Sequence, residues 1–208
     1  EGIISANTKL YSPLEICVQN PWYPDKEDCY ADWQYHGTSD IKRAIAESVN
    51  TFFYQIGGGY KDFQGLGVSK IKKWLKIFNW GLKTDVDLAK EGEGILPSLN
   101  EDWRLGDTYH LSIGQGPFSI TPLQVAAAYV ALANGGKIFQ PAVVHKIIDS
   151  DKQVVEEINP KLIKILPAEQ SNLDIIRQGM RQAVTSAEGS SYILNFLPVE
   201  AAAKTGTA

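Results

Sequence analysis

The clearest helical pattern in the chain lies at residues 68–79, where apolar and charged positions recur with a period near 3.6. The apolar positions share one face and are Val68, Ile71, Trp74, Leu75 and Phe78. The other face carries the lysines Lys70, Lys72, Lys73 and Lys76. This pattern predicts an amphipathic helix that Gly81 ends, with the lysines in solvent.

Two short helices are predicted in the first third of the chain. Thr38 or Ser39 can cap a helix over residues 40–47, because a hydroxyl oxygen can accept a hydrogen bond from the first helical N–H groups. A second helix is expected over residues 51–57, closed by a run of glycines. The triplet "SVN" at residues 48–50 separates the two helices.

Two further helices are marked by their first residues. Thr121 is a suitable cap for a helix over residues 122–134, and Pro122 fits its first turn. Ser171 can cap a helix that runs to about Thr185.

Strand signals are fewer. "AVVHKIIDSDKQVVEEI" predicts a hairpin that turns at residues 150–152, and residues 10–37 read as loop with a short hairpin. Residues 82–110 have no clear period. Residues 199–208 are the one segment suited to a central sheet, so helices dominate an α/β (α+β) chain.

Charge argues against one class of protein, and hydropathy leaves two alternatives for the location of the chain. The net charge of −4 argues against a nucleic-acid binder, which would show a basic face. No apolar run is long enough to span a membrane, and residues 1–20 lack the order of a signal peptide, so either the protein is cytosolic or its targeting segment lies outside this sequence. The chain opens without methionine, in sequence that reads as mid-domain. We therefore expect residues 1–208 to form one domain that is incomplete at both ends.

The two cysteines, Cys17 and Cys29, leave three alternatives open. A disulfide closing this short loop is typical of an exported protein. Together with Asp32 and His36 they could instead ligate zinc, although the spacing matches no standard finger. Free thiols are the third alternative.

The string "KTGT" at residues 204–207 can carry chemistry. On a strand, Lys204 and Gly206 would point one way and the two threonines, Thr205 and Thr207, the other. The hydroxyls could then bind a carboxylate, Lys204 would supply positive charge, and Gly206 would leave room for a ligand against the backbone. The alternative is an ordinary edge strand.

Combined with "SVN", this string resembles the S-x-x-K, S-x-N and K-T-G signature of penicillin-recognising serine acyl-transferases. Longer stretches in the same order extend the resemblance: "ESVNTFFYQIG", "KTDVDLAKEGEGILPS", "GDTYHLSIGQGPFSITPLQVAAAYVALANGGKIFQP" and "AAKTGTA". On these the chain is similar to class B penicillin-binding proteins of the elongation type. The resemblance implies the transpeptidase or β-lactamase-like fold, here mostly its helical subdomain with the K-T-G strand and a small hairpin.

In that family a nucleophilic serine and its lysine precede the S-x-N triplet, and no S-x-x-K string lies within residues 1–38. Two later strings, Ser39 to Lys42 and Ser69 to Lys72, are at the wrong places and are interpreted as chance matches. We expect the chain to be the part of a D,D-transpeptidase that follows the nucleophile, and to be inactive alone.

The resemblance also implies roles for residues of this chain. Ser48 would relay a proton, Asn50 would orient the substrate amide, and Lys204 would stabilise charge. Thr205 and Thr207 would bind the terminal carboxylate beside Gly206. The family usually has glycine before K-T-G, where this chain has Ala203.

The implied substrates are peptidoglycan stem peptides ending in D-Ala-D-Ala, with β-lactams as acylating analogues. The implied partner is a membrane glycosyltransferase, the implied location the outer face of the bacterial cell membrane, and the chemistry needs no cofactor. Alternatives on the same fold are a D,D-carboxypeptidase or a β-lactamase. A non-catalytic module that binds muropeptides or a protein partner is a third.

Overall fold

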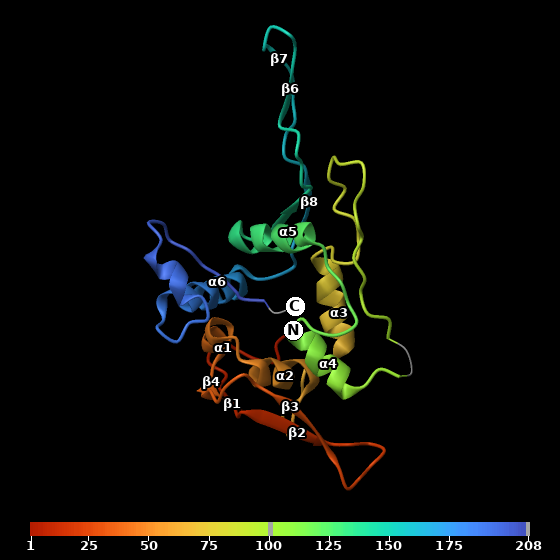
Figure 1. Ribbon diagram of the computed structural model, residues 1–208, viewed down its shortest axis with the longest axis vertical. Coiled ribbons are helices and arrows are strands. Elements are labelled where there is room, and N and C mark those ends of the chain that lie inside the picture. The colour runs from red at the N-terminus through yellow and green to blue at the C-terminus, as the bar shows by residue number, and fades with distance from the viewer. Residues whose placement is uncertain (100–101, 207–208) are drawn as a thin grey trace. The chain divides into compact units, whose positions relative to one another are not determined.

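The computed structural model describes residues 1–99 and 102–206, which form two compact units. The first comprises residues 1–71, 98–116 and 174–208, and the second comprises residues 72–97 and 117–173. Figure 1 labels most of the helices and strands of both units. No helix among the described residues is long and apolar enough to cross a membrane.

The first unit contains the two short helices predicted on either side of "SVN". These are α1 (Ile41–Glu47) and α2 (Asn50–Gly58). The cap of α1 is neither Thr38 nor Ser39 but Asp40, whose side chain accepts a hydrogen bond from the Arg43 N–H at 2.9 Å. Thr38 and Ser39 are engaged instead in a strand, which removes them from the capping position.

Two strand pairs precede these helices. β2 (Glu15–Gln19) and β3 (Glu27–Ala31) form the expected antiparallel hairpin. β1 (Leu10–Ser12) also pairs antiparallel with β4 (Gly37–Ser39), a pairing that the sequence did not predict. Each of these strands has three residues, too few to show a period of two.

Helix α4 (Leu105–Ser112) lies at the end of the segment predicted to be irregular. The Asp107 carboxylate accepts a hydrogen bond from the Arg104 N–H at 2.8 Å and fixes the first turn. Tyr109 of α4 is fully buried against Tyr54 of α2 and Ile16 of β2. Burial raises the pKa of Tyr109 to about 12, and its hydroxyl donates to the Gly59 carbonyl at 2.6 Å. Packing against α2 thus stabilises a helix that has little local signal of its own.

The C-terminal part of the first unit contains most of α6 (Gln170–Thr185) and the short 3-10 helix η1 (Tyr192–Phe196). Ser171 is not the cap of α6, because the helix already begins at Gln170. The predicted strand over residues 199–208 is not observed in its described part, residues 199–206. A strand requires a paired neighbour, and the backbone here bonds instead to helix α6: the Ala203 N–H donates to the Met180 carbonyl at 3.0 Å.

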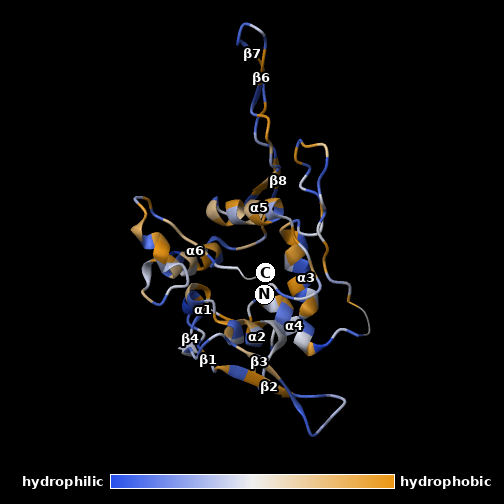
Figure 2. Cartoon of the chain, in the orientation of Figure 1, coloured by the Kyte–Doolittle hydropathy of each residue, from blue (hydrophilic) through white to orange (hydrophobic). Residues whose placement is uncertain are grey.

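The second unit contains most of α3 (Val68–Ile77), α5 (Pro122–Ala133) and four strands. β5 (Lys137–Phe139) pairs with β8 (Leu162–Ile165), and β6 (Lys146–Ile148) pairs with β7 (Val154–Glu157) in the predicted hairpin. Helix α5 is hydrophobic along most of its length (Figure 2). Thr121 caps it as predicted, in a reciprocal pair with Gln124.

Gln124 also organises the irregular segment beside α5. Its side-chain amide is buried and donates to the carbonyls of Leu82 and Glu93 at 2.6 and 2.8 Å. The core of this unit lies between α5, β5 and the segment that follows β8, and contains Ala131, Ile138, Leu166 and Leu173.

Candidate active site

Ser48 occupies a sharp turn between α1 and α2. Its backbone is left-handed (φ 58°, ψ 49°), a conformation uncommon for a residue with a side chain. Its N–H donates to the Ala44 carbonyl and ends α1. The next residue, Val49, is fully buried beside Phe52, so the turn is anchored in the core while Ser48 stays partly exposed.

Lys204 contacts Ser48 although 156 positions separate them in the chain. The Lys204 Nζ donates to Ser48 Oγ at 2.7 Å, to the Thr205 carbonyl at 3.1 Å and to Thr205 Oγ1 at 3.3 Å. Burial lowers the pKa of Lys204 below its usual value, because desolvation disfavours the charged ammonium. The structure therefore brings together the two motifs that the sequence analysis selected.

Two hydrogen bonds hold the segment before Lys204 in place, and one contact holds the residue after it. The Ala203 N–H bonds to Met180, and the Arg181 guanidinium donates to the Ala201 carbonyl at 2.8 Å. Downstream, Thr205 Oγ1 lies 3.4 Å from Ser190 Oγ. The Ser190 N–H in turn donates to the Ala46 carbonyl of α1. This network links the lysine segment to the helix that ends at Ser48.

The remaining predicted residues surround this contact. Asn50 is the first residue of α2 and is half-buried. Thr205 and Gly206 are exposed, and a methyl group added at Gly206 would meet no atom within 4 Å, so space for a ligand exists there. Thr207 lies outside the described residues. Two hollows of about 310 and 320 Å³ in this unit are lined by other residues.

A buried polar cluster behind Ser48 was not foreseen as a support for it. Asp32 Oδ2 accepts hydrogen bonds from the Thr51 N–H at 2.8 Å and from Thr51 Oγ1 at 2.9 Å. His36 Nδ1 lies 3.0 Å from Glu47 Oε2, and its Nε2 lies 3.5 Å from Asp32 Oδ1. Burial alone would raise the pKa of Glu47, but hydrogen bonds from Arg43 and His36 outweigh it and lower this pKa. The only signal for this cluster in the sequence was its polar residue types.

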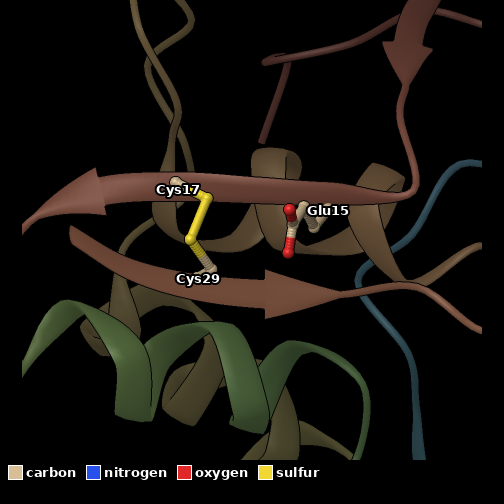
Figure 3. Close-up of side chains that lie close together, drawn as sticks. All are labelled: Glu15, Cys17 and Cys29. Atoms are coloured by element: carbon tan, nitrogen blue, oxygen red, sulfur yellow. A yellow bond between two sulfur atoms is a disulfide. The ribbon is translucent and has the colours of Figure 1, made fainter.

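The zinc alternative of Cys17, Cys29, Asp32 and His36 is not supported. Cys17 and Cys29 lie directly opposite each other on β2 and β3 and are joined by a disulfide, with Glu15 beside it (Figure 3). Bonded sulfurs offer no thiolate to a metal. Asp32 and His36 are engaged with Thr51 and Glu47 instead.

The two S-x-x-K strings interpreted as chance matches are not arranged as a serine–lysine pair. Ser39 is 1% exposed in β4. Ser69 is exposed on α3, and Lys72 donates to the Pro97 carbonyl.

Comparison with known families identifies the arrangement. Residues 4–208 match the family described as "Penicillin binding protein transpeptidase domain". The chain belongs to this transpeptidase family. The mixed α/β fold of the chain agrees with this assignment. The 2.7 Å contact between Lys204 and Ser48 joins the two strings, "KTGT" and "SVN", that carry the sequence resemblance.

Curated relatives agree with this assignment. The chain is 29% identical to the peptidoglycan D,D-transpeptidase MrdA of Escherichia coli K12, over all of this chain and 32% of that protein. It is 32% identical to MrdA of Salmonella typhimurium, over 99% of this chain and 33% of that protein. The chain thus spans about a third of the length of these relatives.

Solved transpeptidase structures share the fold. Penicillin-binding protein PBP2 from Helicobacter pylori, in complex with MreC, has 32% identity and a TM-score of 0.77, over 99% of this chain and 36% of that one. PBP2 from Pseudomonas aeruginosa, in complex with WCK 5153, has 28% identity and a TM-score of 0.79, over 100% of this chain and 46% of that one. The similarity is to PBP2-type members of the transpeptidase family.

Proposed function

We propose that this chain is the part of a peptidoglycan D,D-transpeptidase that follows the nucleophile and supplies two walls of the active site. The observation that supports this proposal most directly is the 2.7 Å hydrogen bond from Lys204 Nζ to Ser48 Oγ. A lysine, a serine and an adjacent threonine hydroxyl gather at one place, although they come from opposite ends of the chain. These groups could relay a proton and bind the free carboxylate of a peptide during acyl transfer, while the nucleophile is a separate serine.

The geometry suggests how Ser48 acts. Because Lys204 donates to Ser48 Oγ, the hydroxyl hydrogen of Ser48 can point elsewhere. It is then available to protonate the amine that leaves when the acyl-enzyme forms. A lysine with a lowered pKa can in turn return a proton to Ser48. Asn50, two residues after Ser48, would orient the substrate amide.

The K-T-G segment binds the carboxylate end of the substrate in this proposal. Thr205 and Thr207 would donate hydrogen bonds to the terminal carboxylate, and Lys204 would contribute positive charge. Open space at Gly206 lets the peptide lie against the backbone. The Thr207 N–H would serve as one oxyanion donor, a contribution of about 3 kcal/mol in other acyl-transferases.

The nucleophile in this mechanism is the family's S-x-x-K serine. Its oxygen attacks the carbonyl carbon of the penultimate D-Ala, the peptide C–N bond breaks, and terminal D-Ala leaves after taking up a proton. The amine of a second stem peptide then attacks the ester, forms the cross-link and releases the serine. Ser39 is buried, and Lys72 donates to the Pro97 carbonyl, so neither S-x-x-K string of this chain is expected to supply the nucleophile. The chain alone should therefore form no acyl-enzyme.

The proposal extends to partners and location. Relatives of the same family carry the name peptidoglycan D,D-transpeptidase, and one similar structure is a complex with MreC. We infer that the parent protein works at the outer face of the bacterial membrane beside a glycosyltransferase. The Cys17–Cys29 disulfide supports an oxidising compartment.

A fluorescent penicillin tests the proposal. The complete transpeptidase domain should be labelled, Lys204→Ala and Ser48→Ala should reduce the labelling rate by about 100-fold or more, and this chain alone should remain unlabelled. Incubation with stem peptides then identifies the reaction. Cross-linked dimers support a transpeptidase, and release of D-Ala without dimers indicates a carboxypeptidase. Rapid β-lactam turnover indicates a β-lactamase. Binding of muropeptides without any acylation would mean a non-catalytic module.

A further inference from the structure

We propose that Trp33 is a positioning residue that holds the Ser48 turn in its left-handed conformation. The inference rests on the proposed function only for its catalytic consequence. Its structural part concerns the conformation of Ser48 and can be tested separately.

The contact between Trp33 and the turn is direct. The indole Nε1–H of Trp33 donates to the Ser48 carbonyl at 3.2 Å. The direction of that carbonyl is set by the ψ angle of Ser48, which is 49°. A donor fixed at this position therefore favours the left-handed turn over the extended backbone that a serine would otherwise prefer.

Trp33 is itself fixed to the far side of the same turn. Its backbone N–H donates to Asp32 Oδ1 at 2.9 Å. The other oxygen of this carboxylate holds Thr51, through the N–H and the hydroxyl. Two consecutive residues thus bind both ends of the Ser48–Thr51 turn, one through an indole and one through a carboxylate.

The exposure of Trp33 distinguishes positioning from simple packing. Trp33 is 57% exposed, so its side chain contributes little to the hydrophobic core. The ring packs edge-to-face against His36, with 5.3 Å between the ring centroids. Removing the indole N–H should therefore change the Ser48 turn more than it changes global stability.

The consequence for catalysis follows from the position of Ser48 Oγ. This atom receives the Lys204 hydrogen bond, and a change in the Ser48 backbone would move it. A single neutral hydrogen bond of this kind shifts a conformational equilibrium about two- to twelvefold. We expect the acylation rate of the complete domain to fall by a similar factor when the indole N–H is lost.

The variant Trp33→Phe keeps a ring and removes the donor. Trp22→Phe is the matched control, because Trp22 is exposed to 56% and contacts the Arg104 guanidinium rather than the turn. In this chain, Trp33→Phe should shift the Ser48 Cα and Cβ resonances toward extended values and change the Lys204 Cε resonance. Trp22→Phe should leave both residues unchanged. Unchanged Ser48 resonances in folded Trp33→Phe would overturn the inference.

A measurement on the unmodified protein covers the case in which the variant does not fold. Hydrogen exchange at the Trp33 indole should be at least severalfold slower than at the Trp22 indole, because the former is hydrogen-bonded to Ser48. Equal exchange rates would count against the contact. This readout requires no catalysis.

Penicillin acylation of the complete domain then separates the two proposals. Loss of rate in both Trp33→Phe and Ser48→Ala supports both. If Trp33→Phe moves Ser48 while Ser48→Ala acylates normally, the positioning role stands and the proposed function of Ser48 fails. If Ser48→Ala is slow while Trp33→Phe acylates at the rate of the unmodified domain, the function stands and the positioning role in catalysis fails.

Discussion

Replacing Asp32 by alanine tests the support of the Ser48 turn most directly. The Asp32 carboxylate accepts the N–H and the hydroxyl of Thr51 at 2.8 and 2.9 Å, beside the first turn of α2. Asp32 is 7% exposed and Thr51 is fully buried. Water therefore cannot easily replace the lost acceptor.

The expected magnitude follows from these contacts. A hydrogen bond to a charged group contributes about 1.5–3 kcal/mol, and an unsatisfied buried donor costs about 1–3 kcal/mol. The negative charge at the beginning of α2 also interacts favourably with the helix dipole. Because the two Thr51 bonds share one carboxylate and are not fully additive, we expect Asp32→Ala to lower the free energy of unfolding by about 3 kcal/mol.

Asp40→Ala is the matched control. Asp40 caps α1 by accepting one hydrogen bond from the Arg43 N–H, and it is only half-buried. Loss of such a cap costs about 1 kcal/mol. Both variants thus remove an aspartate carboxylate from the beginning of a helix. Asp32 is buried and accepts two hydrogen bonds from Thr51, whereas Asp40 is half-buried and accepts one from Arg43.

Urea unfolding followed by far-UV circular dichroism measures both variants. Asp32→Ala should shift the midpoint of the transition two to three times as far as Asp40→Ala, with similar slopes. Asp32→Asn, which keeps one acceptor, should fall between Asp32→Ala and the unmodified protein. If Asp32→Ala costs no more than Asp40→Ala, the buried carboxylate does not support the turn and the reasoning fails.

Three further predictions concern other parts of the first unit. Reducing the Cys17–Cys29 disulfide should lower the free energy of unfolding by about 3 kcal/mol for a loop of this length, measured by urea unfolding with and without reductant. Because the pKa of Lys204 is lowered in the folded state, stability should rise with pH from that lowered pKa up to 10.5, and Lys204→Met should reduce this rise in unfolding experiments across that range. Gly57→Ala would place a methyl carbon 1.7 Å from Ser112 Oγ, so it should destabilise the protein by about 1–3 kcal/mol in the same assay.

Each of these has an outcome that contradicts it. Equal urea midpoints with and without reductant would mean that the disulfide constrains little. If the stability of Lys204→Met rises with pH as steeply as that of the unmodified protein, a group other than Lys204 causes the rise. A glycine variant of unchanged stability would mean that α2 and α4 pack less closely than the structure shows.

Local signals predicted the elements that depend on neighbouring residues. The helix after Thr121 was foreseen because its cap, its first-turn proline and its end all lie within fourteen positions. The β6–β7 hairpin was foreseen because its strands are adjacent in the chain and the turn between them is polar. In both cases the stabilising interactions, helix capping and turn formation, join residues that are close in the chain.

Elements that depend on distant partners were missed or misplaced. Helix α4 has eight residues and is stabilised by the burial of Tyr109, which no local pattern reveals. The pairing of β1 with β4 joins segments more than twenty residues apart. The segment at residues 199–206 looked like a strand by composition, but its observed backbone bond is to the Met180 carbonyl.

The features of the candidate site also fall into those that local sequence predicted and those that depend on distant contacts. Residue types were enough to identify which groups could act, because the chemistry of a lysine, a hydroxyl and a glycine does not depend on the fold. The order of the motifs was enough to identify the family. Tertiary structure alone decided that Lys204 reaches Ser48 and that Asp32 and Trp33 hold the turn between α1 and α2. The two kinds of interaction act over different distances along the chain. Propensity and capping act within about one helical turn, whereas these contacts join residues 15 to 156 positions apart and form only when the buried faces of α1, α2 and α6 pack.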